Sequence, residues 1–170
     1  IKAAKVATIV AMLRRARCVR LARDGSLRAT APMLDDVALE RLLAQSDSFG
    51  GIGLEHHESS ENSVRPGYFK DWDKAVRSRE LLPHEYVHAW NGKFRRPADL
   101  WTPQYNVPMR NSLLWVYEGM TQYWGHVLAA RAGLSTPGQA RDRLAQVAAW
   151  ADSRSGRRWR NLQDTTNEGT

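Results

Sequence analysis

Residues 81–92 read LLPHEYVHAWNG, and this stretch decides how the rest of the chain is interpreted. It carries two histidines, His84 and His88, four positions apart. On an α-helix such residues are turned by only about 40° and lie about 6 Å apart along the axis, so both can face one ion. Glu85 is rotated by about 100° from them, which puts its carboxylate beside the ion rather than on it. Pro83 fits the first turn of this helix, and Gly92 can close its last turn.

This pattern predicts a metal centre. Two neutral imidazoles with an adjacent carboxylate are the arrangement that zinc hydrolases use. The metal lowers the pKa of a water molecule towards about 7, and the glutamate acts as the general base. We therefore predict Zn²⁺ as cofactor, held by His84 and His88, with Glu85 as the catalytic residue. The structural alternative is a helix whose two histidines lie on the surface or are satisfied in the core.

A zinc hydrolase needs a third protein ligand and one open position. Residues 113–124 form an apolar run with one carboxylate, Glu118, near its centre. A buried glutamate is costly unless it is paired, and a divalent cation is one partner that makes its burial favourable. Thr121 and Gln122 follow three and four positions later, so we expect them to orient the ligands. The alternative is that Glu118 pairs with an arginine such as Arg110.

Three separated motifs carry a resemblance to a known family. They are Gly50-Gly51-Ile52-Gly53-Leu54-Glu55-His56, His84-Glu85-Tyr86-Val87-His88-Ala89-Trp90-Asn91-Gly92-Lys93 and Trp115-Val116-Tyr117-Glu118-Gly119-Met120-Thr121. In this order they resemble the glycyl aminopeptidase family of zinc metallopeptidases, in the gluzincin group. The resemblance implies a mostly helical α+β fold, namely a thermolysin-like catalytic domain with a small edge sheet and a helical half. It also implies that Glu118, on the next helix, is the third zinc ligand.

The resemblance extends to substrate binding. In related aminopeptidases the glutamate of a Gly-x-Met-Glu-Asn segment holds the free amino group of the peptide. The stretch Gly53-Leu54-Glu55-His56 is similar, so Glu55 is the candidate for that role, and Gly53 lets the backbone approach an extended peptide. The alternative is an ordinary glycine-rich turn. The resemblance further implies a preference for glycine or alanine at the first position and a longer parent chain, with a β-rich domain before this region and a PDZ-like domain after it.

The first 30 residues hold eight basic side chains against one acidic one, and the whole chain has a net charge of +7. A patch of this kind can bind nucleic acid or an acidic membrane surface. Apolar residues recur at helical spacing from Val6 to Leu13, and no aromatics are interleaved for base stacking. We therefore interpret this part as an amphipathic helix with a solvated basic face, and nucleic acid is not an expected partner. No apolar run of about 18 residues exists, so we expect no membrane span.

The remaining sequence divides the chain into three expected parts. Residues 1–45 are a basic helical segment, with a second helix over Asp35 to Ala44; residues 46–150 are the catalytic core; and residues 151–170 are a polar tail of loop or frayed end. Within the core we expect an edge strand over Ile52 to His56, a loop or short helix over Asp71 to Glu80 and a capped helix from about Ser135 to Trp150. Cys18 is the single cysteine, which fits a reducing compartment and favours the cytoplasm over the periplasm.

Three functions follow from these observations. The leading one is a zinc aminopeptidase that removes N-terminal residues from peptides by means of metal-activated water. The others are a zinc endopeptidase of the same group and a non-catalytic basic interaction module on a degenerate peptidase fold. A developing oxyanion needs a donor besides the metal, for which Tyr105, Tyr123 and His126 are the candidates within the chain.

Overall fold

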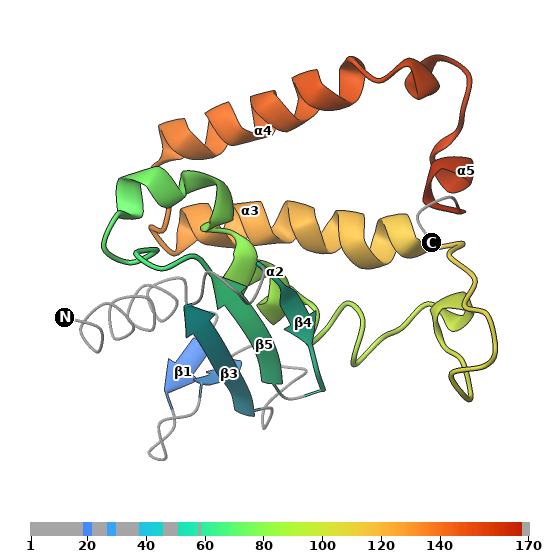
Figure 1. The fold of residues 1–170 in the computed structure, drawn as a ribbon, viewed down its shortest axis with the longest axis horizontal. Coiled ribbons are helices and arrows are strands. Elements are labelled where there is room, and N and C mark those ends of the chain that lie inside the picture. The colour runs from blue at the N-terminus through green and yellow to red at the C-terminus, as the bar shows by residue number, and fades with distance from the viewer. Residues whose placement is uncertain (1–18, 22–26, 30–37, 46–50, 58, 168–170) are drawn as a thin grey trace.

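The computed structural model describes residues 19–21, 27–29, 38–45, 51–57 and 59–167. It has a small sheet on one side and a larger helical half on the other, which is the mostly helical α+β class that the sequence predicts (Figure 1). The helix predicted from Val6 to Leu13 lies outside the described residues. The strands are β1 (Val19–Leu21), β2 (Leu27–Ala29), β3 (Ala38–Gln45), β4 (Gly53–Glu55) and β5 (Ser59–Val64).

The strands form one sheet in the order β1-β2-β3-β5-β4. Neighbours are antiparallel except β3 and β5, which are parallel from the pair Glu40 and Ser59 to the pair Gln45 and Val64. The prediction of a helix over Asp35 to Ala44 is therefore wrong from Ala38 onward, where the chain forms β3. The segment ALERLLAQ favours a helix locally, but pairing with strands on both sides satisfies its backbone and overrides that preference. The predicted edge strand is confirmed, because β4 lies at the end of the sheet.

The segment after the sheet leads into the helix that carries the two histidines. It contains the 3-10 helix η1 (Trp72–Ser78), which agrees with the predicted short helix. Helix α2 (Leu81–Val87) follows, with Pro83 in its first turn as expected and His88 as its C-cap. Gly92 does not close the helix directly. It lies four residues beyond the cap. Its φ of 143° favours glycine, and so does the ring of Tyr117, because a Cβ at this position would lie only 2.8 Å from that ring.

The helix that carries Glu118 has two parts. The π-helix η3 (Trp115–Met120) runs directly into α3 (Thr121–Arg131), and Gly133 follows with a φ of 75°, as expected for a residue that closes a helix. Helix α4 (Pro137–Asp152) begins with a capping box in which the side chains of Thr136 and Gln139 each bond the other residue's backbone. The short 3-10 helix η2 (Ala98–Leu100) lies in the long connection between α2 and η3.

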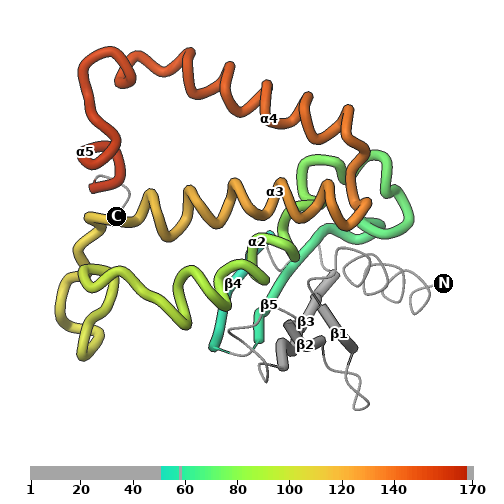
Figure 2. Tube along the Cα trace, turned by 180° about the vertical axis from the view of Figure 1, so that it is seen from behind, coloured from blue at the N-terminus to red at the C-terminus, as the bar shows by residue number. Residues whose placement is uncertain are grey.

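The C-terminal residues are more ordered than the sequence suggests. They contain the 3-10 helix η4 (Ser155–Arg158) and helix α5 (Leu162–Asn167), so the predicted loop over residues 151–170 is wrong for these segments. The side chain of Asn161 accepts a hydrogen bond of 2.8 Å from the backbone N–H of Asp164, which caps α5. As both views show, α5 returns to the start of the η3–α3 helix (Figure 2).

The core lies between β5, α2 and α3. Tyr86 of α2 is 1% exposed, and its ring meets that of Trp90 edge to face. The other buried apolar side chains come from β5, the segment before α2, α2 itself and α3 with the turn that follows it: Val64, Tyr68, Phe69, Ala75, Leu82, Ala89, Ala129, Ala132 and Leu134. Helix α2 is thereby held between the sheet and α3, which fixes the direction in which its polar face points. None of the helices in the described ranges is long and apolar enough to cross a membrane.

Candidate metal centre

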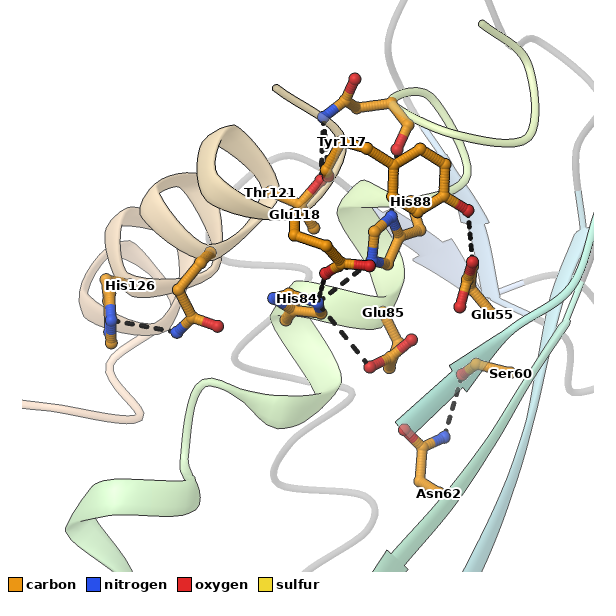
Figure 3. A network of polar contacts seen from close by, with 12 residues as sticks. Glu55, Ser60, Asn62, His84, Glu85, His88, Tyr117, Glu118, Thr121 and His126 are labelled. Atoms are coloured by element: carbon orange, nitrogen blue, oxygen red, sulfur yellow. Dashed lines mark hydrogen bonds and ion pairs between the residues drawn. The ribbon is translucent and has the colours of Figure 1, made fainter. Parts of the chain in front are cut away.

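His84, His88 and Glu118 converge from two elements that are far apart in the sequence (Figure 3). The two Nε2 atoms of His84 and His88 are 3.0 Å apart on α2. Oε2 of Glu118, from η3, lies 3.3 Å from Nε2 of His84 and 3.5 Å from Nε2 of His88. The structure therefore brings together the three side chains that we predict as metal ligands. The alternative, an ion pair of Glu118 with Arg110, is not seen, although both residues lie in the described part of the chain.

The separations fit a divalent cation. Ligand atoms about 2.0–2.1 Å from a tetrahedral zinc lie about 3.3 Å from one another, close to the three distances found here. Partial burial raises the pKa of Glu118, but hydrogen bonds from His84 and His88 outweigh it and hold that pKa at about 2. Glu118 is thus ionised at neutral pH, as a metal ligand must be. Nδ1 of His84 is buried and has no hydrogen-bond partner among the described residues.

The orientation of His88 is set by Asn91. Nδ1 of His88 lies 3.0 Å from the backbone oxygen of Asn91, to which it can only donate, and this contact turns Nε2 toward Glu118. The side-chain amide of Asn91 donates to Oγ1 of Thr121 at 2.9 Å, and Thr121 is fully buried. Thr121 is therefore linked to His88 through Asn91 and not by direct contact, and its predicted role in orienting the ligands stays a prediction.

Asn91 also stabilises the π-helix that presents Glu118. A π-turn is rare and leaves backbone carbonyls without their usual partners, and it often occurs at functional sites. The amide of Asn91 donates to the carbonyl of Val116 at 2.8 Å and to that of Tyr117 at 3.2 Å. One side chain thus joins the two ligand-bearing elements. No local pattern of the sequence indicates this role, because the partners of Asn91 are 25 to 30 residues away.

Gln122 is placed differently from its predicted role. Its amide lies 3.0 Å from Nε2 of His126, and it makes no hydrogen bond to a metal ligand within the described part of the chain. His126 is buried, and burial is the main cause of its lowered pKa. The other two candidate oxyanion donors, Tyr105 and Tyr123, are exposed and make no hydrogen bond to a site residue among the residues described.

Glu85 is buried against the ligands, and only 5% of it is exposed. Its Oε1 lies 4.0 Å from Nε2 of His84, and its Oε2 has no hydrogen-bond partner among the described residues. Burial raises the pKa of Glu85. Gly53 of β4 makes room for its carboxylate, because a Cβ at that position would overlap Oε1 of Glu85. The close approach of Glu85 therefore favours a glycine at this position.

Glu55 lies on the other side of His88, at the end of β4. The hydroxyl of Tyr117 donates a hydrogen bond to its Oε1, and Nζ of Lys93 is 3.4 Å from the same atom. Burial raises the pKa of Glu55. The hydrogen bond from Tyr117 and the charges of His88 and Lys93 lower that pKa by more, so it lies below the usual value for glutamate. The ring of Tyr117 also packs against His88, at 4.8 Å between centroids. Tyr117 and Lys93 were not identified from the sequence.

A second group of potential ligands exists in the described residues, formed by Glu55, Glu85 and His88, whose ligand atoms lie within 4.8 Å of one another. It fits a metal less well than the first group. Glu55 is already engaged by Tyr117 and Lys93, and the raised pKa of Glu85 opposes the ionised form that a ligand needs. We therefore assign the candidate metal centre to His84, His88 and Glu118.

Comparison with known proteins identifies the family of this chain. The profile of the family described as M61 glycyl aminopeptidase matches residues 77–170, which include α2 and η3 but not β4. Among solved structures, an aminopeptidase N family protein from Idiomarina loihiensis is similar, with 23% identity and a TM-score of 0.49. The similarity covers 78% of this chain and 21% of that one, so this chain spans about a fifth of that protein. No curated protein matches. Because the matched residues make up more than half of the sequence, this chain belongs to the M61 glycyl aminopeptidase family.

Proposed function

We propose that the chain carries the catalytic centre of a zinc-dependent aminopeptidase with a thermolysin-like arrangement. The observation that carries the proposal is the convergence of His84, His88 and Glu118 at separations of 3.0 to 3.5 Å, with Glu85 buried beside them. These three residues would hold the zinc ion. When bound, zinc lowers the pKa of a water molecule and polarises the carbonyl of the peptide bond.

The proton transfers fall to Glu85. Its buried Oε2, which has no partner among the described residues, is available to take a proton from the attacking water and to deliver it to the leaving amine. The raised pKa makes Glu85 a stronger base than an ordinary carboxylate, so that one group can serve as base and then as acid. His88 keeps its Nε2 lone pair free for the metal because Asn91 holds its Nδ1 proton.

Glu55 supports aminopeptidase activity over endopeptidase activity. In an N-terminal substrate the amino group is separated from the scissile carbonyl by a single Cα, so a carboxylate that binds the amine must lie within a few ångströms of the catalytic groups. Glu55 meets this condition, since its carboxylate is within 4.8 Å of ligand atoms of Glu85 and His88. The contacts of Glu55 with Tyr117 and Lys93 both go to Oε1, and the amine would bind the other oxygen.

One observation favours the alternative of a zinc endopeptidase. Lys93 already neutralises part of the charge of Glu55, and a site with no amine to bind would tolerate this. A preference for glycine or alanine at the first position, a β-rich domain before this region and a PDZ-like domain after it remain proposals that rest on family membership.

Replacing the base tests the mechanism. We expect Glu85→Gln to bind one zinc ion per chain, as the wild type does, but to lose at least about 10³-fold in kcat on an alanine anilide substrate, because the amide cannot accept the proton. Zinc content by mass spectrometry and initial rates check this. Wild-type turnover in a zinc-loaded Glu85→Gln variant would reject the assignment of the base.

Replacing Glu55 separates the two peptidase classes. We expect Glu55→Gln to raise KM for free-amino peptides by about tenfold or more, because a charge-assisted hydrogen bond to the ammonium is lost. The N-acetylated versions of the same peptides are poor substrates in both proteins. If the substitution affects free and acetylated peptides equally, Glu55 does not read the amino terminus and the endopeptidase alternative stands.

A further inference from the structure

A cavity of about 860 Å³ opens beside Glu85. Its wall includes His84 and Glu85, but neither Glu55, His88 nor Glu118 lines it. This volume is within the range of pockets that bind small organic molecules. The cavity therefore adjoins the catalytic groups without being part of the metal centre.

The floor of the cavity is apolar and firmly packed. It is formed by Val64, Tyr68, Ala75 and Leu81, of which the first three are buried members of the core. The hydroxyl of Tyr68 donates to the backbone oxygen of Ser78 at 3.0 Å, so the phenol group is held in place and has its partner. Such a floor can receive an uncharged side chain of a peptide.

The rim of the cavity is basic. Arg65, Lys74 and Arg77 are exposed lining residues, and none of them makes an ion pair with another described residue. Asp71 is the exposed acidic residue of the lining. Glu80 also lines the cavity. Its carboxylate lies 3.4 Å from a guanidinium nitrogen of Arg143, which balances its charge. The rim thus has a surplus of positive charge without protein partners in the described chain.

The direction of the substrate follows from these positions. If Glu55 holds the amino terminus, the first residue lies on the His88 side of the metal, and the part of the peptide beyond the scissile bond leaves past Glu85 and His84. We propose that the cavity binds this leaving part and that its basic rim binds the C-terminal carboxylate of short peptides. The preferred substrates would then be di- and tripeptides with a free carboxyl end. This inference rests on the proposed function.

Pairs of peptides that differ only at the carboxyl end test the proposal. Ala-Ala, Ala-Ala-Ala and a hexa-alanine peptide are compared with their C-terminal amides on the full chain loaded with zinc. For at least one of the two short peptides, we expect the KM of the acid to be at least about fivefold lower than the KM of its amide. For the hexapeptide we expect little difference, because its carboxyl end extends beyond the rim. The difference should shrink as salt is raised, because exposed charges are screened.

Substitution of the rim gives the second arm of the test. The double variant Lys74→Met and Arg77→Met should abolish the acid preference through KM while kcat is unchanged. Lys74→Glu with Arg77→Glu should reverse it, so that the amide binds better. The matched control is Arg157→Met with Arg158→Met, which removes two exposed charges of η4 and should leave the preference intact.

The outcomes distinguish this inference from the proposed function. Alanine p-nitroanilide has no carboxylate and reports aminopeptidase activity alone. If the chain cleaves it but treats acids and amides equally, the carboxylate subsite is wrong and the aminopeptidase assignment stands. If nothing is cleaved, the proposed function fails, and calorimetric binding of Ala-Ala and its amide decides the subsite independently. Tighter binding of the acid that disappears in the Lys74→Met and Arg77→Met variant would support it, and equal binding would reject it.

Discussion

The ligand-bearing elements and the C-terminal arm of this molecule are built in contrasting ways. Tyr86 of α2, Tyr117 of η3 and Thr121 of α3 are buried, and the side chain of Asn91 contacts two backbone carbonyls and Thr121. The arm of α4, η4 and α5 contains no buried residue, and Trp150 and Trp159 are 60% and 71% exposed. Close packing is therefore concentrated around the candidate metal centre and not along the arm.

The arm is anchored by polar contacts at one end. Arg79 is 3% exposed, and its Nη1 donates to the carbonyl of Leu134 and to Oε1 of Gln139 at 3.0 Å each. The ion pair of Glu80 with Arg143 adds a second link between α4 and the segment before α2. The same change of residue should therefore have a large effect in the first region and a small one in the second.

The largest difference is expected for glycine replaced by valine. A Cβ on Gly125 of α3 would lie 3.2 Å from Cα and Cβ of His84, so the two helices would have to separate. Gly125→Val should lower the free energy of unfolding by about 3 kcal/mol and abolish metal binding, because overpacked backbone cannot relax by changing a rotamer. Gly156→Val, in the open space around η4, should change it by less than about 0.5 kcal/mol. Chemical denaturation checks both, and similar losses in the two variants would contradict the contrast.

A second pair of glycines lies on one segment. Gly53→Ala forces the carboxylate of Glu85 to move, whereas a Cβ on Gly51 would meet only the carbonyl oxygen of Ser63 at 3.8 Å. We expect Gly53→Ala to reduce kcat on the order of 100-fold, because a displacement of about 1 Å from the productive geometry costs that much, and Gly51→Ala to be nearly neutral. Steady-state kinetics of the zinc-loaded variants measure this. Equal kcat values in the two would show that the position of Glu85 does not depend on Gly53.

Two asparagines, Asn91 near the metal centre and Asn161 in the arm, allow the same comparison for zinc affinity. Asn91→Ala removes the amide group that donates to Val116, Tyr117 and Thr121, and should weaken zinc binding by about 10- to 100-fold. Asn161→Ala removes the cap of α5 and should cost about 1 kcal/mol of local stability without changing zinc affinity. Competition with a chromogenic chelator gives both affinities. Unchanged affinity in Asn91→Ala would mean that His88 is oriented by its backbone contact alone.

The smallest effect is expected in the arm. Trp150 is mostly exposed, and its ring lies 4.3 Å from the guanidinium carbon of Arg154. Trp150→Ala should lower the free energy of unfolding by no more than about 1 kcal/mol, the strength of an exposed cation–π contact, and should leave kcat unchanged. Thermal unfolding and the anilide assay measure these. A loss of several kcal/mol would show that this ring is part of a packed interface.

The sequence predicts the features that depend on local geometry. The helical spacing of His84 and His88 is such a feature, and so are the capped start of α4 and the single acidic residue in the apolar run around Glu118. Strand β3 was predicted as a helix because its residues favour one and only the neighbouring strands decide otherwise. These pairings are not visible in a window of a few residues.

The missed site residues have the same explanation. Asn91 bonds residues 25 to 30 positions away, and Tyr117 meets Glu55 across 62 positions. A sequence read without its fold contains no sign of such contacts. Gln122 illustrates the opposite error: its spacing from Glu118 suggested a contact with the ligands, but its side chain turns to His126, four residues further along α3.

The location of the bound metal tests the central claim most directly. Crystals grown with zinc and measured on both sides of the zinc absorption edge give an anomalous difference peak at the ion. We predict one strong peak between Nε2 of His84, Nε2 of His88 and a carboxylate oxygen of Glu118, about 2.0–2.1 Å from each. A peak at Glu55, Glu85 and His88 instead, or no peak in zinc-saturated crystals, would contradict the assignment.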